Sequence, residues 1–250
     1  MEQLRILMGM PVTINIIGDA VPPEIFEQVF SYFEYIDEKF STYKPYSEIS
    51  LLNQHVLELS NTSHDMQTVF EQAEEFRSAT GGYFDIRHAG SYDPSGLVKG
   101  WGISNAAEIV RQAGYSNFYV EAGGDFQVAG KNGQGQNWSM GIRSPFNMDE
   151  IVKVLSVTDC GVATSGTYIR GQHIYNPVSG ALEITDILSL TVIGPDIYPV
   201  DCYATAAFAM GRDGIGFIEA LDGFEGYMID QKGIATFTSG FERYVAHALD

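Results

Sequence analysis

Hydrophobic positions along the chain follow two different periods, which predict both strands and helices. In residues 12–18 apolar and polar side chains mostly alternate, as is typical of a half-buried strand ended by Gly18. After Pro22-Pro23 the apolar residues recur every three or four positions as far as Phe40, which places one stripe along a helix. Similar patterns predict further helices over residues 63–80, 101–113, 200–210 and 213–221.

The second half of the chain is richer in strands. Short apolar runs broken by Gly or Pro predict strands over residues 118–120, 126–128, 138–142, 152–155, 188–193, 226–230 and 234–237. The first four of these suggest an antiparallel meander, and the whole order indicates an α+β fold with mainly antiparallel sheets. No linker divides the chain, so we expect a single domain over residues 1–250. Two closely packed α+β halves, about 1–125 and 126–250, remain an alternative within it.

Composition and charge exclude several classes of protein. The 250 residues are 45% hydrophobic, which is enough for a packed core. The 14 basic residues against 32 acidic ones give a net charge of −18 without a basic cluster, so a nucleic-acid partner is not expected. No apolar run is long enough to cross a membrane. Cys160 and Cys202 lack metal or redox spacing and are expected to be buried free thiols. The first residues do not resemble a signal peptide, so we expect a cytoplasmic protein, with an extracytoplasmic origin open for a longer chain.

Three glycine-rich groups can bring backbone N–H groups close to a phosphate. They cover residues 93–100, 121–125 and 161–166. Glycine has no Cβ to block such an approach, neighbouring Ser and Thr hydroxyls add donors, and Lys99 adds a positive charge. For any one group, a turn between short strands is the simpler explanation. None of the three matches a P-loop or a dinucleotide-binding fingerprint.

Two further segments carry residues suited to catalysis. Asp201 and Thr205 lie four positions apart in a predicted helix, so both face one side of it. A carboxylate and a hydroxyl oxygen are a partial ligand set for Mg²⁺, although a capping Asp201 and a packed Thr205 would explain the same spacing. His173 precedes an Asn-Pro and Ser-Gly turn and can act as a general base near neutral pH. A loop histidine bonded to the backbone is the alternative.

These segments belong to a series of short motifs that runs along nearly the whole chain. The motifs are Met8-Gly9-Met10, Phe40-Ser41-Thr42-Tyr43-Lys44 with residues 47–53, Gly82-Tyr83-Phe84-Asp85, residues 93–101, Ala122-Gly123-Gly124-Asp125, Ala163-Thr164-Ser165-Gly166, His173-Ile174-Tyr175-Asn176-Pro177 and Asp201-Cys202-Tyr203-Ala204-Thr205-Ala206. In this order they resemble the ApbE family of FAD:protein FMN transferases, formerly called thiamine biosynthesis lipoproteins.

The resemblance implies a duplicated fold of the T-fold type and a Mg²⁺-dependent reaction. FMN would pass from FAD to a Thr or Ser hydroxyl of a target protein, with release of AMP. Asp201 and Thr205 would bind Mg²⁺ through side chains, and Gly96 and Ala204 through backbone carbonyls. His173 would activate the acceptor hydroxyl. The FAD contacts that the resemblance implies are Met8, Tyr43, Asp85, Asp93, Lys99, Ser165 and Ile174.

The sequence departs from the family pattern in three places. The stretch between Asp85 and Asp93 is much shorter than usual, Asn176 stands where the family usually has Asp, and the signal and lipid-anchoring Cys are absent. The expected partners are FAD and a protein acceptor, with no nucleic acid and no membrane insertion. A Mg²⁺-dependent FAD pyrophosphatase giving FMN and AMP, and a FAD-binding protein without turnover, remain alternative functions. Asp125 and Asp201 remain alternatives to His173 as the base.

Overall fold

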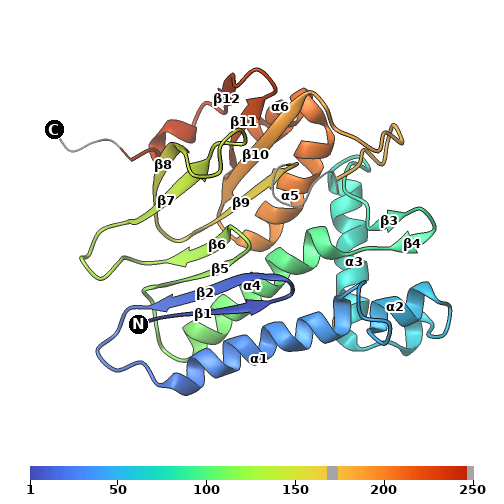
Figure 1. Ribbon diagram of the computed structural model, residues 1–250, viewed down its shortest axis with the longest axis horizontal. Coiled ribbons are helices and arrows are strands. Elements are labelled where there is room, and N and C mark those ends of the chain that lie inside the picture. Colours follow the sequence, from blue (N-terminus) through green and yellow to red (C-terminus); the bar gives the residue numbers. More distant parts are fainter. Residues whose placement is uncertain (168–173, 247–250) are drawn as a thin grey trace.

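A computed structural model describes residues 1–167 and 174–246 and contains one large sheet with helices packed against it (Figure 1). Every neighbouring pair in this sheet is antiparallel. In spatial order the strands of the eight-stranded sheet are β1 (Glu2–Leu7), β2 (Met10–Ile16), β5 (Phe118–Ala122), β6 (Asp125–Ala129), β9 (Cys160–Gly166), β10 (Ile187–Gly194), β11 (Glu225–Asp230) and β12 (Ala235–Phe237).

The helices lie between the strands in sequence. They are α1 (Pro23–Phe40), α2 (Glu48–Asn53), α3 (His64–Ala79), α4 (Ser95–Gln112), α5 (Ile197–Ala209) and α6 (Gly214–Glu219), with short 3₁₀ turns η1 (Leu59–Asn61), η2 (Gly211–Asp213) and η3 (Phe241–Tyr244). The prediction of an α+β fold with antiparallel sheets is confirmed. Strand β6 pairs with β9 through Phe126 and Val162, so strands from both ends of the chain form one sheet. A division into halves near residue 125 stays a prediction.

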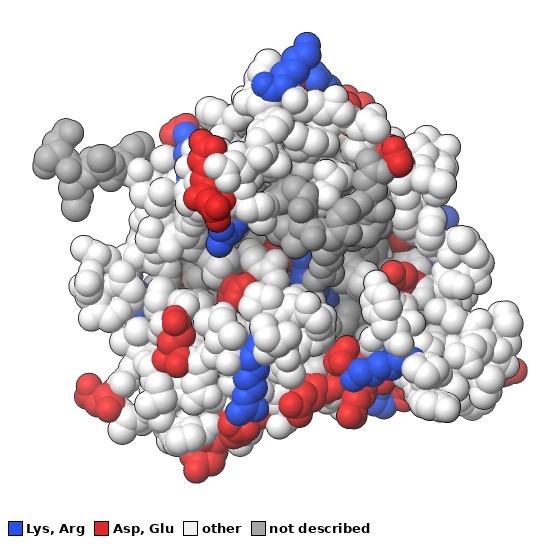
Figure 2. Space-filling model, in the orientation of Figure 1, with Lys and Arg blue, Asp and Glu red and all other residues white. Residues whose placement is uncertain are grey.

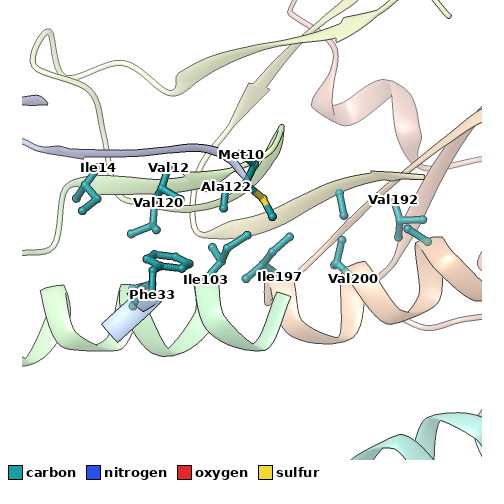
Figure 3. Packing of buried hydrophobic residues seen from close by; sticks show 14 of the residues in the cluster. Met10, Val12, Ile14, Phe33, Ile103, Val120, Ala122, Val192, Ile197 and Val200 are labelled. Atoms are coloured by element: carbon teal, nitrogen blue, oxygen red, sulfur yellow. The ribbon is translucent and has the colours of Figure 1, made fainter. Parts of the chain in front are cut away.

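The main core lies between the sheet and the helices α1, α4 and α5. The alternation predicted for residues 12–18 buries Val12 and Ile14 of β2 on the helix side. Figure 3 shows these side chains pointing towards Phe33 of α1 and Ile103 of α4. Full burial of an aliphatic side chain of this size contributes about 1.5–3 kcal/mol, so this layer fixes the helices against the sheet.

Helix α4 begins earlier than the sequence predicted. We expected a helix over 101–113, whereas α4 begins at Ser95, whose N–H donates to the Asp93 carboxylate at 3.0 Å. The glycines at its start allow close packing and do not form a turn. A Cβ on Gly100 would lie 2.7 Å from the Asp201 Cβ, and one on Gly102 would lie 2.8 Å from the Ile36 side chain. Glycines that are typical of loops, Gly100 and Gly102, therefore lie inside a tightly packed helix.

The predicted meander is wrong at the step from its second to its third strand, although all four strands are present and the last two pair antiparallel. β7 (Trp138–Arg143) and β8 (Ile151–Val157) form a separate two-stranded sheet, and β9 takes the place beside β6. The β7 side chains alternate between buried and exposed, and Trp138 and Met140 pack into a second cluster with Val162 of β9. Because Ala163 belongs to the main core, this cluster lies on the opposite face of the large sheet.

The 161–166 glycine group also differs from the expected turn, because it lies in β9. A Cβ on Gly161 would lie 2.3 Å from the Ile197 nitrogen, so the small residue lets α5 approach the sheet. The α5 helix is capped by Asp196, whose carboxylate accepts a hydrogen bond from the Tyr198 N–H at 2.8 Å. Asp201 is therefore not the cap of this helix.

Two other predictions concern the cysteines and membrane spans. Cys160 and Cys202 are buried free thiols, as predicted. Within the ranges that the structure describes, no helix combines the length and the apolar character needed to cross a bilayer.

Figure 2 shows acidic side chains dispersed over one face of the molecule, with Lys and Arg side chains scattered among them and not gathered into a patch.

Candidate functional site

The candidate site is a pocket of about 140 Å³ at the start of α4. Its walls come from α4, α5, the end of β9, and the segments around residues 85 and 175. Sequence-predicted site residues from both halves of the chain meet here. Those that line the pocket are Asp85, Asp93, Gly96, Lys99, Ser165, Ile174, Asp201 and Thr205.

Helices α4 and α5 approach closely where they form the floor of the pocket. A Cβ on Gly96 would lie 3.4 Å from the Thr205 Oγ1, so Gly96 is in near contact with this hydroxyl. One turn further along α4, the Gly100 N–H donates to the Asp201 carboxylate at 2.8 Å. The four-residue spacing of Asp201 and Thr205 thus places both side chains against α4, as the predicted helix required.

Lys99 lies between two buried carboxylates. Its ammonium group forms an ion pair with Asp125 and lies 3.3 Å from the Asp201 Oδ1. Asp125 also accepts a hydrogen bond from the Thr164 N–H at 3.0 Å, which ties the ion pair to β9. When both carboxylates are ionised, the three groups carry a net negative charge in a site shielded from water.

The electrostatics of this cluster favour an additional cation. Burial raises the pKa of Asp201 to about 7, and repulsion from Asp125 acts in the same direction. Lys99 and the Gly100 N–H lower that pKa but do not compensate for the burial. A bound divalent cation would supply the missing positive charge and keep the Asp201 carboxylate ionised.

The donor set around this cluster suits Mg²⁺. It offers the Asp201 carboxylate, the Thr205 hydroxyl and the nearby Gly96 backbone, which together supply the hard oxygen ligands that Mg²⁺ prefers. In residues 1–167 and 174–246, no group of three or more His, Cys, Asp and Glu side chains is arranged to hold a metal. A cation here would therefore depend on hydroxyl and backbone oxygens as well as on Asp201.

The remaining predicted residues lie elsewhere. Met8 is in the turn between β1 and β2, with a φ of 52°, and packs against the edges of two core clusters. Tyr43 follows α1 and is 95% exposed. Ala204 is fully buried in the main core and does not line the pocket. His173, the expected base, lies outside the described residues, and its predicted function stays a prediction.

His88 and Tyr175, which were not predicted as site residues, also line the pocket. The rings of His88 and Tyr175 are 4.0 Å apart between centroids, and the Tyr175 hydroxyl lies 2.8 Å from the Asp85 carbonyl oxygen. His88 belongs to a small hairpin of β3 (Arg87–His88) and β4 (Ser91–Tyr92). The short stretch after Asp85 thus folds as one wall of the pocket. Periodicity could not reveal this pair, because its members are far apart in sequence.

The turn predicted after residue 173 is present from Asn176 onward. The Asn176 Oδ1 accepts hydrogen bonds from the N–H groups of Val178 and Ser179, at 3.0 and 2.9 Å. An aspartate carboxylate has an oxygen that can accept the same two bonds, so the departure from the family residue keeps the turn. The turn holds Ile174 and Tyr175 in the wall of the pocket.

Comparison with known proteins identifies the family. The sequence profile of the ApbE family matches residues 8–91 and 87–228, and the chain belongs to that family. The fold agrees with solved structures over nearly the whole chain. The flavin transferase ApbE from Vibrio cholerae superposes with a TM-score of 0.86 at 23% identity, covering 98% of each chain. The ApbE protein from Thermotoga maritima gives a TM-score of 0.88 at 21% identity, covering 99% of each.

Curated relatives match part of the chain. The FAD:protein FMN transferase from Vibrio cholerae is 30% identical over 138 residues, which cover 51% of this chain and 41% of the relative. The enzyme of the same name from Escherichia coli K12 is 27% identical over 150 residues, which cover 56% and 43%. The matched region therefore spans about two fifths of the length of these relatives.

Proposed function

We propose that the protein is a Mg²⁺-dependent FAD:protein FMN transferase that modifies a Ser or Thr hydroxyl of an acceptor protein. The observation that carries this proposal is that Lys99 and Asp201 line one pocket together with Thr205, with Asp125 paired to Lys99, in a chain that belongs to the ApbE family. The names of the relatives with 27–30% identity agree with it.

In the proposed reaction the acceptor oxygen forms a bond to the phosphorus of the FMN half of FAD. The bond between that phosphorus and the bridging oxygen breaks, AMP leaves with the electron pair, and the hydroxyl proton passes to a base. Such transfers depend mainly on positioning and on neutralising the charge of the phosphates. Among the described residues that line the pocket, Lys99 is suited to pair with a phosphate oxygen, and Asp125 holds its ammonium group in place.

Asp201 and Thr205 are proposed to hold Mg²⁺ through their side chains, with Gly96 and Ala204 contributing backbone oxygens. The bound ion would supply charge neutralisation at the diphosphate. The positive charges of the ion and of Lys99 would then balance the negative charges of the Asp125 and Asp201 carboxylates.

The size of the pocket indicates which part of FAD it would hold. Its volume of about 140 Å³ is well below the roughly 300–1,000 Å³ of typical ligand pockets. The diphosphate would therefore bind here, and the remainder of FAD would extend over the surface. The predicted contacts Met8 and Tyr43, which do not line the pocket, lie on the outside of the molecule or at a turn and are proposed to meet that extended part.

His173 is proposed to take the proton from the acceptor hydroxyl. A hydroxyl is a weak nucleophile at neutral pH, and an imidazole can accept its proton there. Asp125 is less suited because Lys99 and the Thr164 N–H already engage its carboxylate. Asp201 is less suited because it is proposed as a metal ligand.

A cytoplasmic location also stays a proposal.

The test is incubation of the protein with FAD, MgCl₂ and candidate acceptor proteins, followed by analysis of nucleotides and of covalently bound flavin. AMP together with a flavin-labelled acceptor would support the transferase. AMP together with free FMN would indicate a pyrophosphatase instead, and FAD binding without AMP would indicate a binding protein. The reaction should stop when EDTA removes divalent cations.

A further inference from the structure

A second and larger cavity lies on the opposite face of the sheet from α4 and α5. This groove, of about 800 Å³, has its floor on the outward side of β2, β5 and β6 and one wall on the β7–β8 hairpin. Tyr119, Phe126, Trp138 and Met140 give it a largely apolar lining. Nothing in the proposed transfer of FMN makes use of it.

The groove is continuous with the candidate site. Gly123 and Thr164 line both the groove and the smaller pocket. Gly123 is in the tight turn between β5 and β6, and Thr164 is the residue whose N–H holds Asp125. A chain lying in the groove would therefore reach the region of Lys99 by passing this turn.

One carboxylate in the groove floor pairs with no Lys or Arg of residues 1–167 and 174–246. Glu121 is only 9% exposed, and its carboxylate accepts a hydrogen bond from the Gly124 N–H at 2.7 Å. In the described parts of the chain no Lys or Arg forms a salt bridge with Glu121. The other charged residues of the lining are Asp125 and Arg143, and both have partners. The Asp125 carboxylate pairs with Lys99, and the Arg143 guanidinium donates a hydrogen bond to the Met148 carbonyl.

The surroundings of Glu121 make it a recognition group for a cation. Burial raises the pKa of its carboxyl group, the Gly124 N–H and the Thr13 hydroxyl lower it, and repulsion from Asp125 raises it further. A positively charged group placed in the groove would relieve this cost. The net charge of −18 would also attract a basic segment from a distance.

We infer that this groove binds the hydroxyl-bearing segment of the acceptor protein as an extended chain, with a Lys or Arg of that segment paired with Glu121. The inference rests on the proposed transferase function and identifies the partner's chemistry. Apolar side chains of the segment would pack on the groove lining and its rim at Leu4, which is 59% exposed. Such an arrangement would fix the distance between the basic residue and the modified hydroxyl.

The experiment uses a library of synthetic decapeptides with a central Thr and randomised neighbours. The library is incubated with the intact protein, FAD and MgCl₂, and the flavin-labelled peptides are isolated by fluorescence and sequenced. We expect Lys or Arg to be enriched at one fixed distance from the Thr. Glu121→Gln should reduce that enrichment about tenfold, because a neutral amide cannot pair with a cation.

Two matched controls separate the groove from general effects. Glu34→Gln removes the same charge from the exposed side of α1 and should leave the enrichment unchanged. Leu4→Ser should weaken labelling of all peptides, whereas Ile6→Ser should not. Ile6 is 67% exposed on the same strand and points to the same side as Leu4, but it does not line the groove.

The possible failures are distinct. If the wild-type protein releases AMP but labels peptides without a basic preference, the inference is wrong while FAD chemistry stands. An unchanged preference in Glu121→Gln would also overturn it, as would a parallel loss of FAD affinity, which would place Glu121 in the FAD site. If no AMP is released under any condition, the proposed function itself fails, and the inference fails with it.

Discussion

The carboxylate of Asp201 accepts a hydrogen bond from the backbone N–H of Gly100 at 2.8 Å, although the two residues are 101 positions apart in the chain. This bond joins the first part of α4 to α5 beneath the candidate pocket. It is possible because residue 100 has no side chain, so that the two helices can approach until backbone and carboxylate meet.

Adding a methyl group at this contact should destabilise the protein. In Gly100→Ala the new Cβ would lie 2.7 Å from the Asp201 Cβ and 2.9 Å from the Ile197 carbonyl oxygen. Relief of such crowding costs about 1–3 kcal/mol. Urea denaturation should show this loss in the free energy of unfolding. Gly216→Ala is the matched control, because its helical site in α6 has no atom within 4 Å, and it should be neutral or slightly stabilising.

Asp201→Asn should abolish FAD turnover without unfolding the protein. The amide has the size of the carboxylate, so packing against α4 is kept, but a neutral oxygen is a much weaker ligand for Mg²⁺. AMP release should be measured as a function of Mg²⁺ concentration, with Asp222→Asn as a control at an exposed position. If Asp201→Asn kept the activity of the wild type at limiting Mg²⁺, Asp201 would not be a metal ligand.

His173→Ala should separate catalysis from binding. If the imidazole accepts the acceptor's proton, its removal should lower the rate of FMN transfer by about 10²- to 10⁴-fold. FAD affinity should stay nearly unchanged, because the base acts on the acceptor. FAD titration and single-turnover AMP release measure the two effects. A parallel loss of affinity would make His173 a ligand contact, and an unchanged rate would transfer the function to a carboxylate.

Glu48 should give the protein part of its acid sensitivity. Burial acts to raise the pKa of this carboxyl group, but its bonds to Lys39 and Ser63 outweigh burial and lower the pKa below 4.5. The folded form thus holds a proton less tightly than the unfolded form. Its stabilising contribution is present above about pH 4.5 and is lost as the pH falls through the lowered value.

Glu48→Gln should therefore lower the free energy of unfolding at neutral pH. The difference from the wild type should shrink as the pH falls below 4.5, where the wild-type carboxyl becomes protonated. Chemical denaturation at a series of pH values measures this convergence. A constant difference at all pH values would mean that packing, and not charge, explains the contribution of Glu48.

The sequence predicted the elements whose pattern is set by burial along one segment. The alternation in β2 and the stripe of α1 are such patterns, and both elements are present. The start of α4 and the strand β9 were missed because their glycines resemble turn residues. Gly100 and Gly161 are required by contacts with α5, which lies far along the chain. Local sequence does not contain that information.

The candidate site shows the same limit. The spacing of Asp201 and Thr205 is visible in sequence, since it depends on a single helix. The pairing of Lys99 with Asp125 depends on how α4, β6 and β9 meet, and the contact of His88 with Tyr175 depends on two separate loops. The order of the motifs along the chain predicted most of the residues that line the pocket. Which of these residues contact one another could be known only from the fold.

The order of assembly on the ribosome follows from the pairing of β6 with β9. When synthesis has reached residue 159, the nascent chain contains Lys99 and Asp125. It still lacks β9, whose Thr164 N–H donates to Asp125, and α5, which carries Asp201. The strand neighbouring β6 is then missing, and the central edge of the sheet is open. The ability to retain a ligand must therefore appear late in synthesis, after α5 has emerged, so the growing chain passes through a stage in which its largest sheet has an exposed edge that other chains can join.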